Sequence, residues 1–295
     1  MSKYTSLTEA LQDVFGSETA IIDRRPVSGG DINQAYLLEL SNRTSIFMKS
    51  NRIENLGFFR AESEGLLAMK ATGTVQVPEV LALGTQEGTA FLLLSCIEEG
   101  RRTGESSVKL GRDLASMHMA DSSMFVEHGR YGFLNDNYIG ASEQVNDPKD
   151  SWLEFFADCR LLPQFQKAAS WFGREDRARF DALISKLDRY LPEPEHPSLL
   201  HGDLWGGNYM IDKQGDPWLI DPAAYVGHRE ADLAMTELFG GFDRAFYDAY
   251  KESAGIDPEY QDRRDLYNLY HLLNHLNLFG GSYLQAVLSI IRKMS

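Results

Sequence analysis

The sequence predicts an α+β protein built from two lobes, a β-rich lobe followed by a larger, mainly helical one. Before residue 96 the apolar residues fall in short runs separated by glycine and polar turns, which is typical of antiparallel strands. Beyond residue 100 they recur mostly at helical spacing. A chain of 295 residues is long enough to bury such a core. We therefore expect a first lobe over residues 1–96 and a second lobe over residues 97–295.

The first lobe is expected to hold one antiparallel sheet and one helix that packs against it. A short helix over residues 7–15 opens the chain, and a second helix over residues 57–69 places apolar residues on the side that would face the sheet. Strands are predicted over residues 20–22, 35–40, 45–49, 77–84 and 89–95.

The second lobe is expected to consist of helices around one short hairpin. The hairpin joins residues 209–211 to residues 217–220 through a polar turn, and a short apolar run over residues 197–200 precedes it. A polar loop is expected over residues 121–150. Helices are predicted over residues 107–119, 152–168, 175–190, 231–239, 244–253 and 266–279, with a last helix that ends at residue 294.

The residues around this hairpin carry the strongest functional signal. Residues 201–208 read His-Gly-Asp-Leu-Trp-Gly-Gly-Asn, and Asp221 follows the second arm. Protein kinases use an H-R-D-L-x-x-x-N loop followed by a metal-binding Asp, and Asp203 and Asn208 keep the spacing of that loop. The first hypothesis is therefore a phosphoryl-transfer site. The ordinary alternative is a surface turn that carries two aspartates and an asparagine.

Phosphoryl transfer explains why these residue types are suitable. The reaction needs Mg²⁺ held against the phosphates and a hydroxyl held in line with them. Asn208 and Asp221 offer the oxygen ligands that Mg²⁺ prefers, and they flank the open end of the hairpin. Asp203 would orient the acceptor hydroxyl and take its proton. His201 comes just before this base and is expected to position the loop by hydrogen bonds.

Two segments of the first lobe are candidates for binding nucleotide phosphates. Ser28, Gly29 and Gly30 form a glycine turn between two strands, where backbone N–H groups can approach a phosphate closely. Lys49 ends the third strand, as the phosphate-binding Lys of kinases does. Taken singly, the glycine turn would also fit an ordinary hairpin, and Lys49 would also fit a solvated residue at the end of a strand. The order of the turn, Lys49 and the catalytic segment along the chain favours phosphate binding.

The partner of Lys49 and the adenine site are predicted from neighbouring segments. Glu62 or Glu64 could pair with Lys49, and Glu62 is favoured because it lies on the side of its helix that faces the sheet. Ser95, Cys96 and Ile97 begin the connector between the lobes, where backbone groups would pair with adenine. The Cys96 side chain itself is expected to be a small buried hydrophobe.

Composition argues against several other classes of protein. The formal charge of −14 disfavours nucleic-acid binding through a basic surface, whereas it is compatible with an amine-bearing substrate. The two cysteines lie far apart and indicate neither a disulfide framework nor a zinc site. No signal peptide or membrane span is expected, because the N-terminus lacks an apolar core and the longest uncharged stretch is interrupted by polar residues. We expect a cytoplasmic monomer.

With these motifs in place, the sequence resembles the fructosamine kinase (ketosamine-3-kinase) family, within the aminoglycoside phosphotransferase and choline kinase-like group. The group-level signature is the His-Gly-Asp of residues 201–203 with Asn208 and Asp221. Segments more particular to fructosamine kinases are residues 204–208, 220–223, 230–234 and 238–242, together with residues 137–140, 144, 146 and 152–156. The resemblance thus covers nearly the whole chain.

The resemblance implies a bilobed protein kinase-like fold that uses ATP and Mg²⁺. It implies phosphorylation of a sugar hydroxyl, O3, of a ketosamine such as a fructosamine or ribulosamine adduct, free or protein-bound, and hence a role in deglycation. It assigns the phosphate anchor to Lys49 and Glu62, the base to Asp203, and the metal to Asn208 and Asp221. Trp205 would face the sugar or pack under the loop, and His201 is a further candidate for contact with the acceptor.

The sequence departs from the family pattern at two places. Some relatives carry a redox-active Cys in the glycine loop where this chain has Asp31, and Asp147-Pro148 replaces an aromatic residue of the family.

Two alternative functions remain beside the ketosamine kinase. They are a kinase of another small hydroxyl compound, such as an aminoglycoside or a choline-like amine, and a non-catalytic nucleotide-binding scaffold. The presence of Lys49, Asp203, Asn208 and Asp221 argues against the scaffold.

Overall fold

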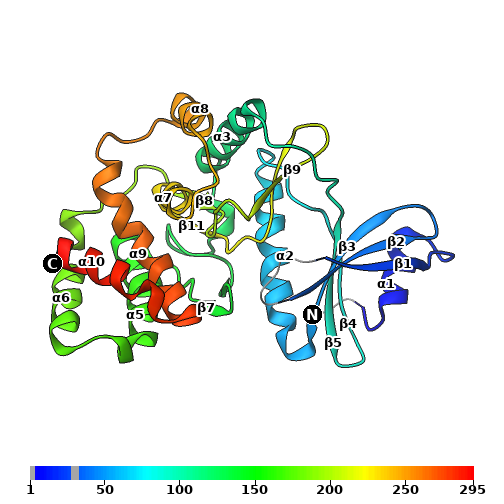
Figure 1. Ribbon diagram of the computed structural model, residues 1–295, viewed down its shortest axis with the longest axis horizontal. Helices are drawn as coiled ribbons and strands as arrows, with labels where there is room; N and C mark the ends of the chain where they lie inside the picture. The colour runs from blue at the N-terminus through cyan, green and yellow to red at the C-terminus, as the bar shows by residue number, and fades with distance from the viewer. Residues whose placement is uncertain (1–3, 28–32) are drawn as a thin grey trace.

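The computed structural model describes residues 4–27 and 33–295 and has two lobes arranged along its long axis (Figure 1). The first lobe is an antiparallel sheet with strand order β1-β2-β3-β5-β4, and the second lobe is mainly helical. These features confirm the predicted α+β class. The division after residue 96 stays a prediction; β5 ends at Ser95 and the next helix begins at Gly104.

The first-lobe elements follow the predicted order with shifted ends. They are α1 Leu7–Phe15, β1 Ile21–Val27, β2 Gln34–Leu40, β3 Ser45–Arg52, η1 Ile53–Asn55, α2 Leu56–Ala71, β4 Val80–Gln86 and β5 Thr89–Ser95. β1 extends beyond the predicted residues 20–22. The prediction was too short because every residue of this edge strand is exposed, so its sequence lacks the apolar alternation that marks a half-buried strand. Glu87 and Gly88 both have positive φ, which is the conformation that a two-residue hairpin turn requires.

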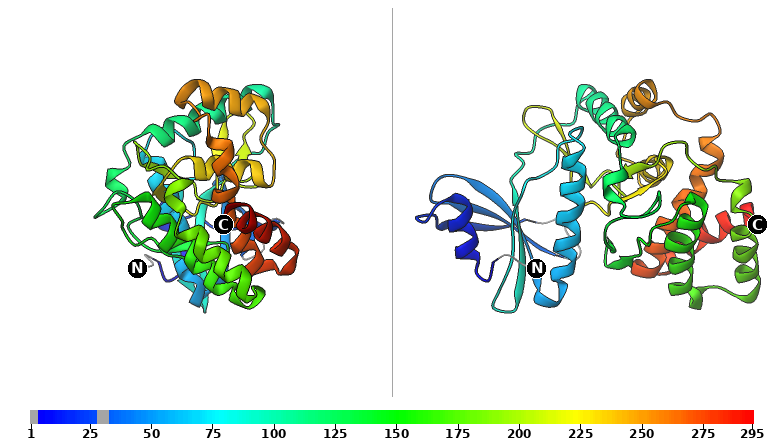
Figure 2. Two further views of the ribbon diagram at one scale, coloured as in Figure 1. Left: turned by 90° about the vertical axis from the view of Figure 1, so that its left-hand side faces the viewer. Right: turned by 180° about the vertical axis from the view of Figure 1, so that it is seen from behind.

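The two faces of the sheet bury different side chains. Ile46 and Met48 of β3 belong to a cluster on the α1 side, whereas Phe47 packs against the core on the α2 side. Because side chains alternate along a strand, Lys49 points toward α2 as Phe47 does. Figures 1 and 2 show α2 between the sheet and the helical lobe, so Lys49 lies on the side of the sheet that faces the second lobe.

The second lobe places short strand pairs among its helices. Its elements are α3 Gly104–Met119, η2 Ser123–Phe125, β6 Asn137–Ile139, β7 Ser142–Gln144, α4 Trp152–Phe156, η3 Ala157–Leu161, α5 Leu162–Lys167, η4 Ala169–Trp171, α6 Arg174–Ile184, η5 Leu187–Arg189, β8 Ser198–Leu200, β9 Tyr209–Ile211, β10 Pro217–Leu219, β11 Tyr225–Gly227, α7 Glu230–Leu238, α8 Arg244–Ala254, α9 Tyr260–Phe279, η6 Gly281–Tyr283 and α10 Leu284–Met294. β9 pairs with β10 as predicted, while the pairs β6–β7 and β8–β11 were not expected.

Three predicted helices differ from the observed ones. The helix expected over residues 175–190 ends at Ile184 and is followed by the separate turn η5. The helix expected over residues 152–168 is interrupted by the π-helical turn η3, and Pro163 lies in the first turn of the next segment, α5, where a proline is tolerated. Helix α9 begins at Tyr260 rather than at residue 266. Its first turns are highly charged, but Arg263 there forms a buried ion pair with Glu230 of α7. This tertiary contact stabilises a segment that has little apolar periodicity.

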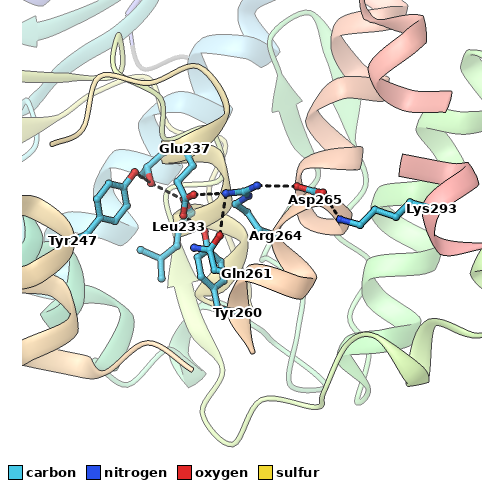
Figure 3. A network of polar contacts seen from close by, with 9 residues as sticks. Leu233, Glu237, Tyr247, Tyr260, Gln261, Arg264, Asp265 and Lys293 are labelled. Carbon is cyan, nitrogen blue, oxygen red and sulfur yellow. Dashed lines mark hydrogen bonds and ion pairs between the residues drawn. The ribbon is translucent and has the colours of Figure 1, made fainter. Parts of the chain in front are cut away.

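A polar network joins the helices of the second lobe (Figure 3). Glu237 of α7 accepts hydrogen bonds from Tyr260 at 2.7 Å and from Arg264 of α9 at 2.8 Å. Arg264 also contacts Asp265, which pairs with Lys293 of α10 at 2.9 Å.

In the part of the chain that the structure describes, no helix is both long and apolar enough to cross a bilayer.

Candidate active site

The hairpin of β9 and β10 brings Asn208 and Asp221 to one end. Tyr209 pairs with Leu219, so the residues just outside the pair are Asn208 and Ile220. Ile220 N donates to Asn208 O at 3.0 Å, which extends the strand pairing by one residue. This bond brings the backbone of Asp221 close to that of Asn208 at the open end of the hairpin. Asp221 has a φ of 54°, an uncommon conformation for a residue other than glycine. Such backbone strain is frequent at functional sites.

Asn208 also joins the metal candidates to the proposed base. Its Nδ2 donates to the backbone oxygen of Asp203 at 2.8 Å and to the Asp203 carboxylate at 3.1 Å. Its backbone N–H donates to Trp205 O at 2.9 Å, which closes the loop between Asp203 and Asn208 as a tight turn. The loop therefore fixes the Asp203 carboxylate relative to the Asn208 amide.

The environment of Asp203 disfavours its charged form. Desolvation raises the pKa of Asp203 to about 7, and the nearby negative charges of Asp221 and Asp232 raise it further. The hydrogen bond from Asn208 lowers this pKa but does not outweigh the other effects. A carboxylate that accepts a proton near neutral pH has the property required of a general base.

Lys49 connects the two lobes through two carboxylates. Its Nζ lies 2.7 Å from Glu62 Oε1 on α2 and 2.5 Å from Asp221 Oδ1 in the second lobe. The lysine is buried, with 7% of its surface exposed. Its partner is Glu62 rather than Glu64, as predicted from the position of Glu62 on the side of α2 that faces the sheet. Glu64 instead accepts a hydrogen bond from Asn135 at 3.1 Å.

The charges of this cluster support one another. Burial acts to lower the pKa of Lys49, but the Glu62 and Asp221 carboxylates outweigh it and raise that pKa, so the lysine is positively charged at neutral pH. Burial raises the pKa of Glu62 to about 7 in spite of the attraction of Lys49. The charged Lys49 ammonium, 2.7 Å from Glu62 Oε1, favours the carboxylate form of Glu62.

Asp232 of α7 holds the catalytic loop from beneath, a role that the sequence did not reveal. It accepts hydrogen bonds from the backbone N–H groups of His201 at 2.7 Å and Gly202 at 2.9 Å. His118 of α3 lies 3.1 Å from it. Although burial opposes ionisation, the contacts with His118 and with the loop lower the pKa of Asp232. A fully ionised carboxylate can satisfy both amides.

Gly202 explains the difference from the H-R-D pattern. Its φ is +81°, and an added Cβ would lie 2.0 Å from the backbone oxygen of Ala223. Ala223 N in turn donates to His201 O at 2.9 Å. The catalytic loop and the segment after Asp221 therefore approach so closely that only glycine fits at position 202.

His201 is placed inside the loop rather than at its surface. Its side chain is fully buried, Nε2 contacts Ile220 O at 2.8 Å, and Nδ1 accepts from Asp203 N at 3.2 Å. These contacts fit the expected positioning of the loop, while contact of His201 with the acceptor stays a prediction. Trp205, in contrast, is 41% exposed beside the loop, and its contact with the acceptor stays a prediction.

The connector carries free backbone groups where adenine binding was predicted. The backbone N–H groups of Cys96 and Ile97 form no hydrogen bond among the residues that the structure describes, and Cys96 is half-buried. Ser95, in contrast, is held by two hydrogen bonds with Glu79. Ser28, Gly29 and Gly30, predicted to cover the phosphates, lie outside the described residues.

The donor set fits Mg²⁺. Because Asn208 directs its Nδ2 to Asp203, its amide oxygen is left as a possible ligand, and no described residue donates a hydrogen bond to it. Asp221 uses only Oδ1 to bind Lys49, and its side chain is 47% exposed. An amide oxygen and a carboxylate, completed by phosphate oxygens and water, suit a hard octahedral cation. Groups of three or more His, Cys, Asp or Glu that would hold a metal without a nucleotide are not found across residues 4–27 and 33–295.

Comparison with solved structures places this geometry in a class. The fold is similar to that of a spectinomycin phosphotransferase, with a TM-score of 0.59 at 14% identity over 98% of this chain and 93% of the other. A protein from Haemophilus somnus assigned as a fructosamine-3-kinase is much more similar, with a TM-score of 0.86 at 28% identity over 98% of this chain and 96% of the other. The fold and the site define a phosphotransferase with a kinase-like fold.

Sequence comparison gives the family within that class. The model of the family described as fructosamine kinase matches residues 3–295. The chain is 40% identical over 292 residues to a protein of Synechocystis named as a probable ketoamine kinase, covering 98% of this chain and 96% of the relative. It is 39% identical over 281 residues to a chloroplastic protein-ribulosamine 3-kinase of rice, Oryza sativa subsp. japonica, covering 94% and 80%. The chain belongs to the fructosamine kinase family, and the predicted resemblance is confirmed.

Proposed function

We propose that the protein transfers the γ-phosphoryl group of ATP to a sugar hydroxyl, O3, of a ketosamine. The family and the relatives named as ketoamine and ribulosamine kinases support this substrate class. The observation that carries the proposal is the contact of Lys49 with Asp221, which joins the sheet of the first lobe to the catalytic hairpin of the second. A deglycation role follows if the product decomposes.

Each residue has a distinct role in the proposed reaction. Lys49, held by Glu62, binds the α- and β-phosphates, and the free N–H groups of the connector pair with adenine. Asn208 and Asp221 bind Mg²⁺, which neutralises the charge on the phosphates when bound. Since Asp221 also binds Lys49 here, its second oxygen or a rearranged carboxylate would face the cation.

Asp203 acts on the acceptor. Its carboxylate would accept a hydrogen bond from the sugar hydroxyl and align the oxygen with the γ-phosphorus. It would take the proton as the new P–O bond forms and the bond between the γ-phosphorus and the bridging oxygen of ADP breaks, so that ADP leaves. Asn208 prevents the carboxylate from rotating, because its amide donates to both the side chain and the backbone of Asp203. The exposed ring of Trp205 offers an apolar surface for the sugar or the amine part of the substrate.

A panel of acceptors tests the proposed function. Purified protein with Mg-ATP should release ADP in the presence of fructosyl-lysine or ribulosyl-lysine, and removal of Mg²⁺ with EDTA should abolish the reaction until Mg²⁺ is added back. Aminoglycosides and choline serve as alternative acceptors. Transfer to these but not to ketosamines would favour the other small-molecule kinase, whereas nucleotide binding with no transfer to any acceptor would favour the scaffold.

A further inference from the structure

The unexpected hairpin of β6 and β7 contacts both halves of the proposed phosphate and metal site. Asn137 pairs with Gln144, Tyr138 with Glu143, and Ile139 with Ser142. Successive side chains of a strand point to opposite faces. One face of the hairpin is buried and carries Asn137 and Gln144, whereas Tyr138 on the other face is partly exposed.

The buried face binds the segment that follows Asp221. Asn137 Nδ2 donates to Ala224 O at 2.7 Å, and Gln144 Nε2 donates to Ala223 O at 3.0 Å and to Asn137 Oδ1 at 2.7 Å. Tyr270 of α9 donates to Gln144 Oε1 at 2.6 Å, which fixes the orientation of the Gln144 amide. The hairpin is therefore bonded to the second and third residues after the metal candidate.

A buried arginine holds the same hairpin from its base. Arg160 is fully buried in the π-helical turn η3 and donates to Val145 O at 2.6 Å and to Asn146 Oδ1 at 2.8 Å. Its guanidinium lies 3.9 Å from the centre of the Tyr225 ring, and it has no carboxylate partner among the described ion pairs. A buried charge is costly, and here aromatic faces and carbonyls compensate it only while the hairpin stays in place.

The other face of the hairpin contacts α2, the helix that carries Glu62. The rings of Tyr138 and Phe58 meet edge to face with centroids 4.2 Å apart. Tyr138 also covers Gly57, where an added Cβ would lie 3.1 Å from its hydroxyl. Phe58 precedes Glu62 by four residues, so the two lie on the same side of α2, one turn apart.

We propose that the β6–β7 hairpin is a positioning element that fixes α2, and with it the Lys49–Glu62 pair, relative to the Asp221 loop, with Tyr138 as the positioning residue. The hairpin is bonded to the Asp221 loop on one face and packs against α2 on the other. Pro222 packs near Gly65 on the far side of Glu62, so α2 is held on both sides of the glutamate. This inference rests on the proposed roles of Lys49, Glu62 and Asp221 in binding Mg-ATP.

Substitution of Tyr138 is a fair test because the ring is not in the core. A cavity of ≈ 470 Å³ opens beside it, lined by residues that include Glu54, Phe58 and Glu143. Tyr138→Ala therefore enlarges an existing space instead of creating a sealed void. Tyr138→Phe keeps the ring contact with Phe58, and Glu143→Ala changes the exposed residue opposite Tyr138, so these two are matched controls.

The experiment measures the affinity for Mg-ATP by calorimetry, together with KM for each substrate and kcat. Tyr138→Ala should weaken Mg-ATP binding by roughly three- to tenfold, the equivalent of losing one aromatic pair, while KM for the ketosamine and the melting temperature change little. Both controls should behave as wild type. Loss of affinity in Tyr138→Phe equal to that in Tyr138→Ala, or a fall in melting temperature with unchanged Mg-ATP affinity, would overturn the proposal.

A double-mutant cycle tests whether Tyr138 acts through Glu62. In a Glu62→Gln background, Tyr138→Ala should produce little further loss of Mg-ATP affinity, because residues that act as one unit are not additive. An undiminished loss in that background would contradict the proposal. The affinity measurement needs no acceptor, so a protein that binds Mg-ATP as described but does not phosphorylate ketosamines would refute the proposed function and leave this inference standing.

Discussion

Two aspartates of the site, the half-buried Asp203 and the fully buried Asp232, have opposite environments, which suit them to different roles. Asp203 is half-buried, its carboxylate accepts a hydrogen bond from Asn208, and desolvation raises its pKa to about 7. Asp232 is fully buried, which acts to raise its pKa, yet His118 and the backbone N–H of Gly202 lower that pKa below its ordinary value. Groups whose pKa values are displaced in opposite directions commonly divide acid–base and structural work. Asp203 is thus suited to accept a proton and Asp232 to hold the loop.

Replacement of Asp203 tests its role as the base. Asp203→Asn should reduce kcat by about 10³-fold, within the range for loss of general acid–base catalysis, because the amide can accept a hydrogen bond from the sugar but cannot take its proton. Steady-state kinetics on fructosyl-lysine would measure this, and Mg-ATP affinity should be retained. The control is Asp216→Asn in the turn of the same hairpin, which should keep activity; full turnover by Asp203→Asn would rule out the assigned role.

Replacement of Asp232 tests the support of the loop. Asp232→Asn leaves one N–H of the loop facing an amide donor and should cost about 3 kcal/mol of stability at pH 7. Because the pKa of Asp232 is lowered in the folded protein, its contribution is present above the unfolded-state value of 3.8 and is lost as the pH falls below it. Melting temperatures of wild type and variant should therefore converge in acid; a constant difference down to pH 3 would contradict this assignment.

At the scale of elements, two segments of the site meet through backbone at Gly202. Gly202→Ala should abolish activity and destabilise the protein by about 2 kcal/mol or more, because its Cβ would collide with a backbone oxygen and the positive φ adds strain. Thermal melting and kinetics would show both effects. The matched control is Gly215→Ala, which has a φ of +90° but no atom within 4 Å, so it should show only the smaller cost of the backbone conformation and retain activity.

The elements that the sequence predicted are those specified by local pattern. The arms of the catalytic hairpin, the strands before the connector and helix α2 combine clear periodicity with turn residues, and the Lys49–Glu62 pair followed from the side of α2 that faces the sheet. The contact of Lys49 with Asp221 joins residues 172 positions apart, and no short-range pattern specifies it.

The elements that the sequence did not predict depend on distant partners. The three-residue strands of β6 and β7 lie within a polar loop, and their buried amides are satisfied by Ala223, Ala224 and Tyr270. Asp232 resembles any acidic residue in the first turn of a helix, where such residues are common. Its only signal was membership of a family-like segment, residues 230–234, and its role became visible when α7 was placed under the catalytic loop.

At the scale of the whole molecule, polar contacts away from the site link three helices of the second lobe, in addition to its hydrophobic core. Arg264→Ala should lower the stability by about 1–2 kcal/mol, since Arg264 links Glu237 of α7 with Asp265 and so with α10 (Figure 3). Denaturant unfolding measures the loss. The control is Arg244→Ala, whose side chain is 92% exposed and pairs only within α8, and which should change stability by less than about 0.5 kcal/mol. Equal effects of the two would show that the network adds nothing.

The two lobes also divide the work of the proposed reaction. The first lobe supplies Lys49 and Glu62, the second supplies Asp203, Asn208 and Asp221, and the ion pair between Lys49 and Asp221 shows that the lobes already meet at the site. The loop is exposed at Trp205, the residue predicted to contact the acceptor, two positions after Asp203.

The position of the phosphate in the product tests the central claim most directly. Wild-type protein, Mg-ATP and fructosyl-lysine would be incubated and the product analysed by phosphorus–proton correlation NMR. The account predicts one phosphate, on O3 of the sugar, and none when Asp203→Asn replaces the wild type. Phosphate on another position, or no phosphorylated ketosamine under conditions in which an aminoglycoside or choline is phosphorylated, would contradict it.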